Sequence, residues 1–424
     1  MLATWGCTTF SKPTLDLQFV GATSLDNRIT FTRASTATFF NSSGVLSTAA
    51  SGEARFDYNP STLAAQGLLI EEQRTNSIRN NTMVGAVAGT PGTVPTNWDI
   101  TVSGSGITQQ IVGTGVEDGI TYIDVKFSGT GSGTAVPQIR PETTTQIVAA
   151  AGQSWASSWY LRIVGGSTTG CTGTFQQVWQ ERDAAGAALN TVTVGIADPT
   201  SAALKTQRSI LTRTLTDAGT ARLTNRIQWT FTNGVAVDIT LRIGLPQLEQ
   251  GAFATSVIPT TTTALTRNAD VASMTGTNFS SWFNAATGTI YSEWNSFANS
   301  TNRYLVDIEQ AASSNDRIDI NINSSNVVNP RTVVSGSAVG TLTGGTYTVN
   351  TNAKIAFAYA SADYASSFNG ATAVTATTAG SLPSSLARMF IGSLAGFQFA
   401  NGYIRGIAYY RVRLPNSTLQ ALTA

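Results

Sequence analysis

The sequence predicts an all-β protein in which a strand-rich N-terminal segment precedes two antiparallel β-sandwiches. Short runs of alternating apolar and polar residues recur at intervals of roughly 8–12 residues, with turn residues between them. The strand-like runs do not alternate with helical segments, as a parallel βαβ protein would require. Charged residues make up 12% of the chain, half of the usual ~25%, so Thr, Ser, Asn, Gln and Gly must form the polar surface.

The first region, residues 1–75, is predicted to be a strand-rich N-terminal segment. Its strand signals are LDLQFV, RITFTRASTATFF, GVLSTA, ARFDY and GLLIEE. Within it, ATFFNSSGVLST predicts a hairpin whose turn spans residues 41–44. These strands are too few for a large core of their own. We therefore expect the segment to pack on a neighbouring domain or on another chain.

The second region, residues 76–260, is predicted to be the first sandwich. Its strand signals include TYIDVKFSG, SWASSWYLRIV, TFQQVWQERDA, ARLTNRIQWTF and VAVDITLRIGLPQLE. In the last of these, apolar residues repeat every two positions, which predicts that Ile239, Leu241, Ile243 and Leu245 share one face of a strand.

A Thr-rich stretch, residues 261–275, lacks helical periodicity and is predicted to be a linker. The third region, residues 276–424, repeats the strand pattern in GTIYSEWNSF, RYLVDIEQ, DRIDININ, AKIAFAYASADY, ARMFIGSL and GYIRGIAYYRVRL, and predicts the second sandwich. Only the closing PNSTLQALTA predicts a short helix.

Composition excludes several classes of function. The chain has no histidine, so Ser-His-Asp triads, Cys-His pairs and His-ligated zinc are impossible. A net charge of +1 without a basic block argues against nucleic acid. We expect no membrane insertion, because no apolar run reaches 18 residues, and no signal peptide. Cys7 and Cys171 are predicted to be two unpaired thiols, with one long-range disulfide as the alternative.

The N-terminal residues resemble the opening of bacteriophage virion proteins of the head-spike-fibre or tail-fibre-like kind. The resemblance covers about residues 14–76, through LDLQF, LDNRITFTRASTATFFNSSGVL and ARFDYNPSTLAAQGLLIEEQRTN. The residues that carry it are Arg28, Phe31, Arg33, Ala34, Thr36, Arg55, the triplet Phe56, Asp57 and Tyr58, and the stretch 68–76. The second region looks like a carbohydrate-binding-module jelly roll, and the third like a laminin-G or concanavalin-like lectin sandwich.

The resemblance implies a non-enzymatic structural appendage, a head fibre, spike or tail fibre, on the exterior of the phage particle. It implies that residues 1–75 are an attachment or oligomerisation segment. It implies other virion proteins, of capsid or tail, as partners, a homotrimer as the oligomer, and host cell-surface polysaccharide as a ligand. Two alternatives stay open: a purely structural capsid decoration or cement protein, and a polysaccharide-degrading tailspike.

Aromatic rings are the first candidates for glycan binding, because a flat ring stacks on the apolar face of a sugar. We single out Trp98, Trp159, Tyr160 and Trp179 as glycan-binding candidates. The alternative is core packing, since β-sandwiches need large aromatic residues inside. Core packing is the expected role of Trp155, Trp229 and Trp294.

Charged residues supply no catalytic or metal site. Glycoside hydrolysis needs two cooperating carboxyl groups, yet Glu71 and Glu72 point to opposite faces of a strand. The clusters Glu117-Asp118, Glu181-Asp183 and Asp316-Asp319 do not stand out. We name no catalytic residue, metal ligand or cofactor and leave a structural calcium ion open.

Arginine supplies 21 of the 25 basic residues, and it suits ion pairs at interfaces better than lysine. Arg28, Arg33, Arg55 and Arg74 crowd the N-terminal segment and are candidates for attachment between subunits or onto the virion. Salt bridges within the domain are the alternative.

Overall fold

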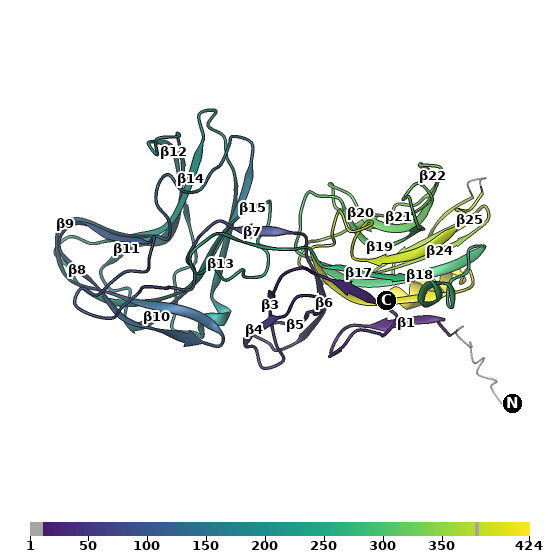
Figure 1. Cartoon of the computed structure of the whole chain (residues 1–424), viewed down its shortest axis with the longest axis horizontal. Coiled ribbons are helices and arrows are strands. Elements are labelled where there is room, and N and C mark those ends of the chain that lie inside the picture. Colours follow the sequence, from purple (N-terminus) through teal and green to yellow (C-terminus); the bar gives the residue numbers. More distant parts are fainter. Residues whose placement is uncertain (1–11, 378–380) are drawn as a thin grey trace.

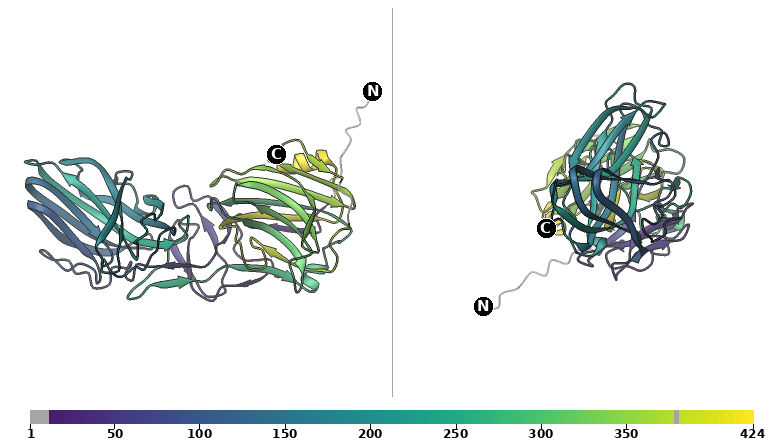
Figure 2. Two further views of the ribbon diagram at one scale, coloured as in Figure 1. Left: turned by 90° about the horizontal axis from the view of Figure 1, so that it is seen from above. Right: turned by 90° about the vertical axis from the view of Figure 1, so that its left-hand side faces the viewer.

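The computed structural model describes residues 12–377 and 381–424, and it confirms the all-β fold class. Strands account for 53% of the chain and helix for 4%. Two β-rich bodies lie end to end along the longest axis, joined by a narrow region that contains β3 (Ala37–Phe40), β4 (Leu46–Ala49) and β7 (Arg74–Asn76) (Figures 1 and 2). Cys7 lies outside the described residues, so its pairing with Cys171 stays a prediction.

The first body contains both termini of the described chain and is a sandwich of two antiparallel sheets. One sheet has the order β26-β25-β24-β18-β28-β6-β5, with β1 also on β28. Its strands are β1 (Leu15–Gln18), β5 (Phe56–Tyr58), β6 (Ala65–Ile70), β18 (Thr287–Ser296), β24 (Ala353–Ala360), β25 (Asp363–Phe368), β26 (Val374–Ala376) and β28 (Gly402–Tyr410).

The second sheet of this body has the order β2-β17-β27-β19-β20-β21-β22, with β23 on β21. Its strands are β2 (Thr30–Thr32), β17 (Val271–Thr275), β19 (Arg303–Gln310), β20 (Arg317–Ile322), β21 (Val327–Val334), β22 (Ser337–Thr341), β23 (Gly345–Thr346) and β27 (Leu386–Ile391). Trp282, Trp294 and Phe357 lie in the apolar core that the two sheets enclose. Because N-terminal and C-terminal strands build it together, we call this body the composite sandwich.

The second body, the inserted sandwich, is formed by strands between residues 99 and 250. Its order is β12-β11-β14-β9-β15-β10-β13, with β8 on β9. The strands are β8 (Asp99–Glu117), β9 (Ile120–Arg140), β10 (Ser154–Gly166), β11 (Cys171–Arg182), β12 (Ala188–Gly195), β13 (Arg208–Thr214), β14 (Arg222–Phe231) and β15 (Ala236–Gln250).

The long hairpin β8–β9 bends across both layers of the inserted sandwich. Residues 122–130 of β9 pair with β15, whereas residues 135–139 pair with β14. Glycine permits the bend: Gly106 and Gly129 both have positive φ, and a Cβ atom on Gly129 would lie 2.1 Å from the carbonyl oxygen of Gly106.

Two short hairpins form the neck between the sandwiches. Strand β3 (Ala37–Phe40) pairs with β4 (Leu46–Ala49), which confirms the predicted hairpin. Strand β7 (Arg74–Asn76) pairs with β16 (Leu265–Arg267), so Asn76 lies opposite Leu265. The chain leaves the composite sandwich after Asn76 and returns to it at Leu265, so the 188 residues between them begin and end at one place. The inserted sandwich is therefore an insertion into the composite one.

This topology places two segments within the composite sandwich. In residues 14–75, β1, β5 and β6 extend the sheet of β28, with Leu15 opposite Tyr409 and Leu68 opposite Ile404, and the attachment role of this segment stays a prediction. The expectation that they pack on a neighbouring domain holds. The Thr-rich stretch 261–275 is not a free linker, because it contains β16 and β17.

The repeat in β15 is only partly as predicted. Ile239, Leu241 and Ile243 lie in the core of the inserted sandwich. Leu245 packs instead with Tyr160 in a separate cluster, because the register of β10 and β15 shifts just before Tyr160 and Leu245 has a φ of 36°. A bulge thus moves one apolar residue to the other face.

Helix is confined to short pieces: η1 (Leu204–Thr206), α1 (Thr277–Ser280) and α2 (Asn416–Thr423). The predicted C-terminal helix is confirmed as α2. It packs on β24 and β25, where Ala356, Ala358 and Ala365 leave room for it. Within the described ranges, none of these helices is long or apolar enough to cross a bilayer.

Candidate functional site

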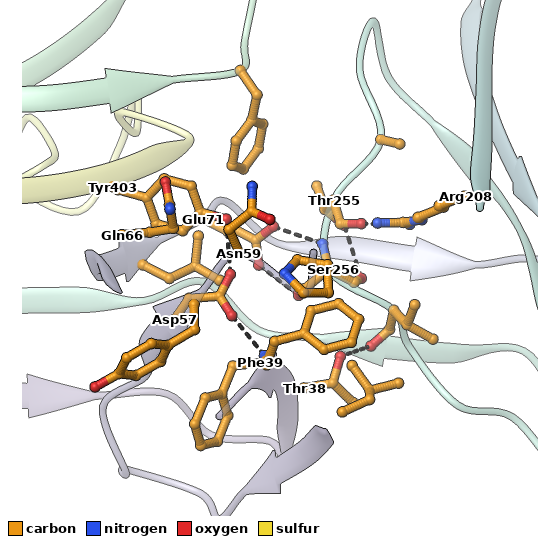
Figure 3. A pocket seen from close by; sticks show the side chains of 18 of the residues that line it. Thr38, Phe39, Asp57, Asn59, Gln66, Glu71, Arg208, Thr255, Ser256 and Tyr403 are labelled. Carbon is orange, nitrogen blue, oxygen red and sulfur yellow. Dashed lines mark hydrogen bonds between the residues drawn. The ribbon is translucent and has the colours of Figure 1, made fainter. Parts of the chain in front are cut away.

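A pocket of about 380 Å³ lies at the neck, where the two sandwiches and the hairpin β3–β4 meet. Figure 3 shows side chains from all three parts facing this neck pocket. The lining includes residues 38–40, 57–60, 66, 69 and 71 of the N-terminal segment, residues 160, 205, 208, 210 and 254–257 of the insertion, and residues 295, 297, 350 and 403 of the C-terminal part.

Aromatic rings form one part of the wall. Phe39, Phe40, Tyr58 and Phe297 are each half-buried, so they are held by neighbours yet retain exposed ring surface. Phe297 makes a T-shaped contact with Tyr403, at 6.2 Å between ring centroids. Rings fixed in this way can pack on the apolar face of a sugar without losing much conformational freedom.

Asp57 is the most unusual polar group of the pocket. One carboxylate oxygen accepts a hydrogen bond from the amide nitrogen of Phe40 at 2.6 Å, and the other accepts from the hydroxyl of Tyr403 at 2.8 Å. Burial raises the pKa of Asp57 to about 6, although both hydrogen bonds oppose this shift. The carboxyl group therefore changes charge in mildly acidic solution, at the point where β3 meets β28.

Glu71 also lines the pocket, and both of its carboxylate oxygens already accept hydrogen bonds from the protein. Its oxygens accept from the amide and hydroxyl of Ser256 at 2.7 and 2.6 Å, and Arg55 lies 2.8 Å away. Burial alone would raise the pKa of Glu71, but the guanidinium groups of Arg267 and Arg55 lower it to about 2. Glu71 is thus ionised and ties the composite sandwich to the insertion.

A buried ion network continues behind Glu71. Asp270 accepts from Arg33 at 3.0 Å and from Arg55, and it also accepts from the backbone amide of Glu71 at 2.9 Å. Arg267 lies 3.7 Å from Asp270. All five side chains are at most 1% exposed. Buried charges of this kind must be paired, so the network fixes the geometry of the neck.

Hydrogen-bonding groups complete the wall on the side of the insertion. Arg208 lies over the ring of Tyr160, with its guanidinium carbon 5.7 Å from the ring centroid. It donates to the carbonyl oxygen of Thr255 at 2.8 Å and to the hydroxyl of Ser158 at 2.9 Å. Amide side chains that line the pocket are Asn59, Gln66, Asn295 and Asn350. Rings on one side and polar groups on the other suit a polyhydroxylated ligand.

The structure places most predicted glycan-binding residues in the core. Trp159 and Trp179 are at most 1% exposed, and Trp98 is 6% exposed. The indole nitrogen of Trp159 donates to Asn225 at 3.0 Å. Their ring faces are covered, so the predicted sugar-stacking role is corrected to core packing. Tyr160 is buried too, yet it lines the neck pocket.

The core role expected of three further tryptophans agrees with their burial. Trp155, Trp229 and Trp294 are 4%, 1% and 0% exposed. Trp229 stacks on Phe175, with 4.8 Å between ring centroids. Large rings fill the space between sheets in both sandwiches.

The four candidate attachment arginines bind their own chain. Arg28 pairs with Asp26 at the surface, and Arg74 pairs with Glu72. Arg33 and Arg55 have no exposed side-chain surface, which leaves them unable to contact another subunit. These four arginines therefore form salt bridges within the chain, as in the alternative to attachment.

The described side chains contain no group of three or more His, Cys, Asp or Glu that could hold a metal ion. In the neck, both oxygens of Asp57 and both of Glu71 already accept hydrogen bonds from the protein.

Sequence reasoning did not single out Asp57, Tyr403 or Phe39 as site residues. Asp57 belongs to the FDY triplet of the resemblance, which was the available signal. Its partner Tyr403 lies 346 positions away in the chain. That separation leaves no local pattern to detect.

Comparison with known proteins gives only distant likenesses. No protein-family model matches the chain, and no curated protein sequence matches it. Among solved structures, a CBM40 domain of the Ruminococcus gnavus IT-sialidase bound to alpha2,3 sialyllactose is 15% identical with a TM-score of 0.30, covering 33% of this chain and 84% of that one.

Two further solved structures cover more of the chain. Trypanosoma rangeli sialidase in complex with the inhibitor DANA is 8% identical with a TM-score of 0.30, over 70% of this chain and 60% of that one. A tail fibre protein of the E. coli phage G7C is 11% identical with a TM-score of 0.23, over 74% of this chain and 39% of that one. We transfer no function from these three.

Proposed function

We propose that the protein is a non-enzymatic appendage on the exterior of a bacteriophage particle and that it binds host cell-surface polysaccharide through the neck pocket. The observation that carries the binding proposal is the combination of half-buried rings, such as Tyr58 and Phe297, with Arg208 and four amide side chains around one cavity. The virion assignment rests on the resemblance of residues 14–76.

The residues of that resemblance also have a structural role. Arg33, Arg55, Asp57 and Glu71 all belong to it, and all four lie at the neck. The shared residues therefore support the junction and its pocket. Attachment to capsid or tail proteins, and assembly into a homotrimer, remain part of the proposal but require other surfaces.

Binding of host polysaccharide to the full chain tests the proposal directly. We would measure it by isothermal titration calorimetry for the wild type, Tyr58→Ala and Arg208→Gln. Loss of one packed ring is worth about 1.5 kcal/mol, so we expect roughly tenfold weaker binding for Tyr58→Ala. Phe397→Ser is the matched control, because Phe397 is 71% exposed and outside the pocket.

The outcomes separate the proposal from its rivals. Equal affinity of wild type and both pocket variants would overturn the neck pocket as the site. A protein that binds no host polysaccharide, yet is found on capsids with gold-labelled antibody, would be a structural decoration. Release of reducing ends would identify a degrading enzyme, although the occupied oxygens of Asp57 and Glu71 argue against one.

A further inference from the structure

Arginine and glutamine side chains gather on the outward face of strands β9, β14 and β11 in the inserted sandwich. Alternation along each strand produces this arrangement. In β11, Phe175 and Trp179 point into the sandwich, so Gln176, Gln180 and Arg182 point outward. In β14, Leu223, Ile227 and Trp229 point inward, and the outward residues are Arg222, Thr224, Arg226 and Gln228.

The strand register brings these outward residues together across the sheet. Arg182 lies directly opposite Arg222, and Val178 lies opposite Arg226. Gln228 lies opposite Gln176 on one side. On its other side, Gln228 lies opposite Gln138 of β9, which places Arg140 beside Arg226 one step further along the ladder. We call this surface the arginine–glutamine face; it consists of Gln138, Arg140, Gln176, Val178, Gln180, Arg182, Arg222, Thr224, Arg226 and Gln228.

The positive charge of this face is largely uncompensated. Arg140 pairs with Asp99. Among the described residues, no carboxylate forms a salt bridge with Arg182, Arg222 or Arg226. Four guanidinium groups and one carboxylate leave a local charge of about +3.

The arginines are close enough to repel one another. Burial lowers the pKa of Arg226, and the charges of Arg140 and Arg182 lower it further. Burial and the charge of Arg140 likewise lower the pKa of Arg182. Like charges opposite each other weaken a sheet, so an anion that neutralises them gains energy from relieving this repulsion.

Hydrogen bonds hold the side chains in place while leaving donors free for a ligand. The Nε of Arg226 donates to the Oε1 of Gln228 at 3.2 Å, and the amide nitrogen of Gln228 donates to the Oε1 of Gln176 at 3.1 Å. The terminal nitrogens of Arg226 are not part of this chain of bonds. Val178, although outward, is only 1% exposed, which shows that the long side chains lie across the strands.

We propose that the arginine–glutamine face binds a polysaccharide that carries carboxylate or sulfate groups. The planar guanidinium fork of Arg226 matches the paired oxygens of either group. The amides of Gln138, Gln176 and Gln228 suit the hydroxyl groups of the sugar rings. The face contains no aromatic side chain on which a nucleic-acid base would stack, which disfavours single-stranded nucleic acid. This second site is separate from the neck pocket and does not rest on it.

Titration of the full chain with defined probes tests this inference. The probes are oligomers of polygalacturonate, dextran sulfate and, as a neutral control, dextran. We expect binding of both anionic probes that weakens as salt rises from 50 to 300 mM, and no binding of dextran. In the double variant Arg222→Gln/Arg226→Gln, affinity for the anionic probes should fall at least tenfold. Arg411→Gln, which removes an exposed arginine of the composite sandwich, should leave it unchanged.

Melting of the double variant separates binding from structure. Removing two repelling charges should leave its melting temperature equal to or above that of the wild type. A lower melting temperature would instead assign the arginines to stability. Unchanged affinity in the double variant, equal binding of dextran, or competition by a single-stranded oligonucleotide at equal charge would each overturn the inference. Tyr58→Ala should retain binding of polygalacturonate, so failure of the neck pocket and failure of this face are distinguishable.

Discussion

The pH dependence of stability at the neck is the sharpest consequence of the buried Asp57 carboxyl. The change to test is Asp57→Asn, which keeps size and shape but removes the titrating group. The Asn oxygen can still accept from the amide of Phe40, and the side-chain nitrogen can donate to the hydroxyl oxygen of Tyr403. The substitution therefore isolates the effect of charge.

The expected magnitude follows from the shift itself. The pKa of Asp57 rises from 3.8 to about 6 in the folded protein. Each unit corresponds to about 1.4 kcal/mol, so two units give about 3 kcal/mol. Since the folded state holds the proton more tightly, this stabilisation is fully present below pH 3.8. It is lost as the pH rises through 6. The free energy of unfolding of the variant, minus that of the wild type, should therefore rise by about 3 kcal/mol between pH 3.5 and pH 7.5.

Urea unfolding at intervals across this range measures the effect as a difference between two proteins. Other carboxyl groups titrate alike in both, so their contributions cancel. Asp16→Asn is the control, because it removes a carboxyl group that is exposed on β1. A flat difference for Asp57→Asn, or one that favours the wild type as pH rises, would refute the reasoning.

Three further predictions concern the neck and the cores. Asp270→Asn removes the carboxylate that pairs with the buried Arg33 and Arg55, so we expect the unfolding free energy, measured by urea titration, to fall by about 3–5 kcal/mol. The control Asp363→Asn changes an exposed carboxylate and should lower it far less. Trp159→Ala removes a fully buried ring and should cost about 3–5 kcal/mol; a variant of wild-type stability that loses glycan binding would contradict its core placement. Joining Asn76 to Leu265 by an Asn-Gly turn, with residues 77–264 deleted, should give a folded composite sandwich by circular dichroism and a cooperative melt, since the two residues are cross-strand partners.

Local patterns in the sequence were sufficient for the fold class and for several elements. Alternation in VAVDITLRIG predicts a strand, and this segment lies in β15. The turn residues 41–44 predict the hairpin β3–β4. The closing helix follows from PNSTLQALTA. Each of these features depends on residues close in the chain, where propensity and periodicity act.

Long-range pairing was beyond the reach of such patterns. Nothing near Leu15 in the sequence indicates that its partner is Tyr409, so local patterns cannot place the N-terminal strands in the sheet of β28. Periodicity likewise places Trp159 and Tyr160 on opposite faces of β10 without saying which face is covered. The register with β13, β15 and the segments packed on them decides that question.

The same limit applies to charged residues. Arg33 and Arg55 are candidates for attachment from the sequence, with salt bridges within the domain as the alternative. Their main partner, Asp270, comes from the Thr-rich stretch more than 200 positions away. Arg222 and Arg226 form no local charge pattern in the sequence, because their neighbours across the sheet lie in other strands. Charge becomes informative only when the register shows which charges meet.

Contacts at the neck oppose bending between the two sandwiches. The two chain connections alone would act as a hinge, but several further contacts join the inserted sandwich to the composite sandwich. Glu71 accepts from Ser256, the hydroxyl of Thr38 donates to the carbonyl oxygen of Val257 at 2.5 Å, and Arg74 lies over Phe253 at 4.7 Å. Such contacts oppose bending, because bending would expose buried charge. If the neck pocket and the arginine–glutamine face both bind polysaccharide, their fixed separation sets which chains can occupy both at once, and avidity then depends on ligand length rather than on linker flexibility.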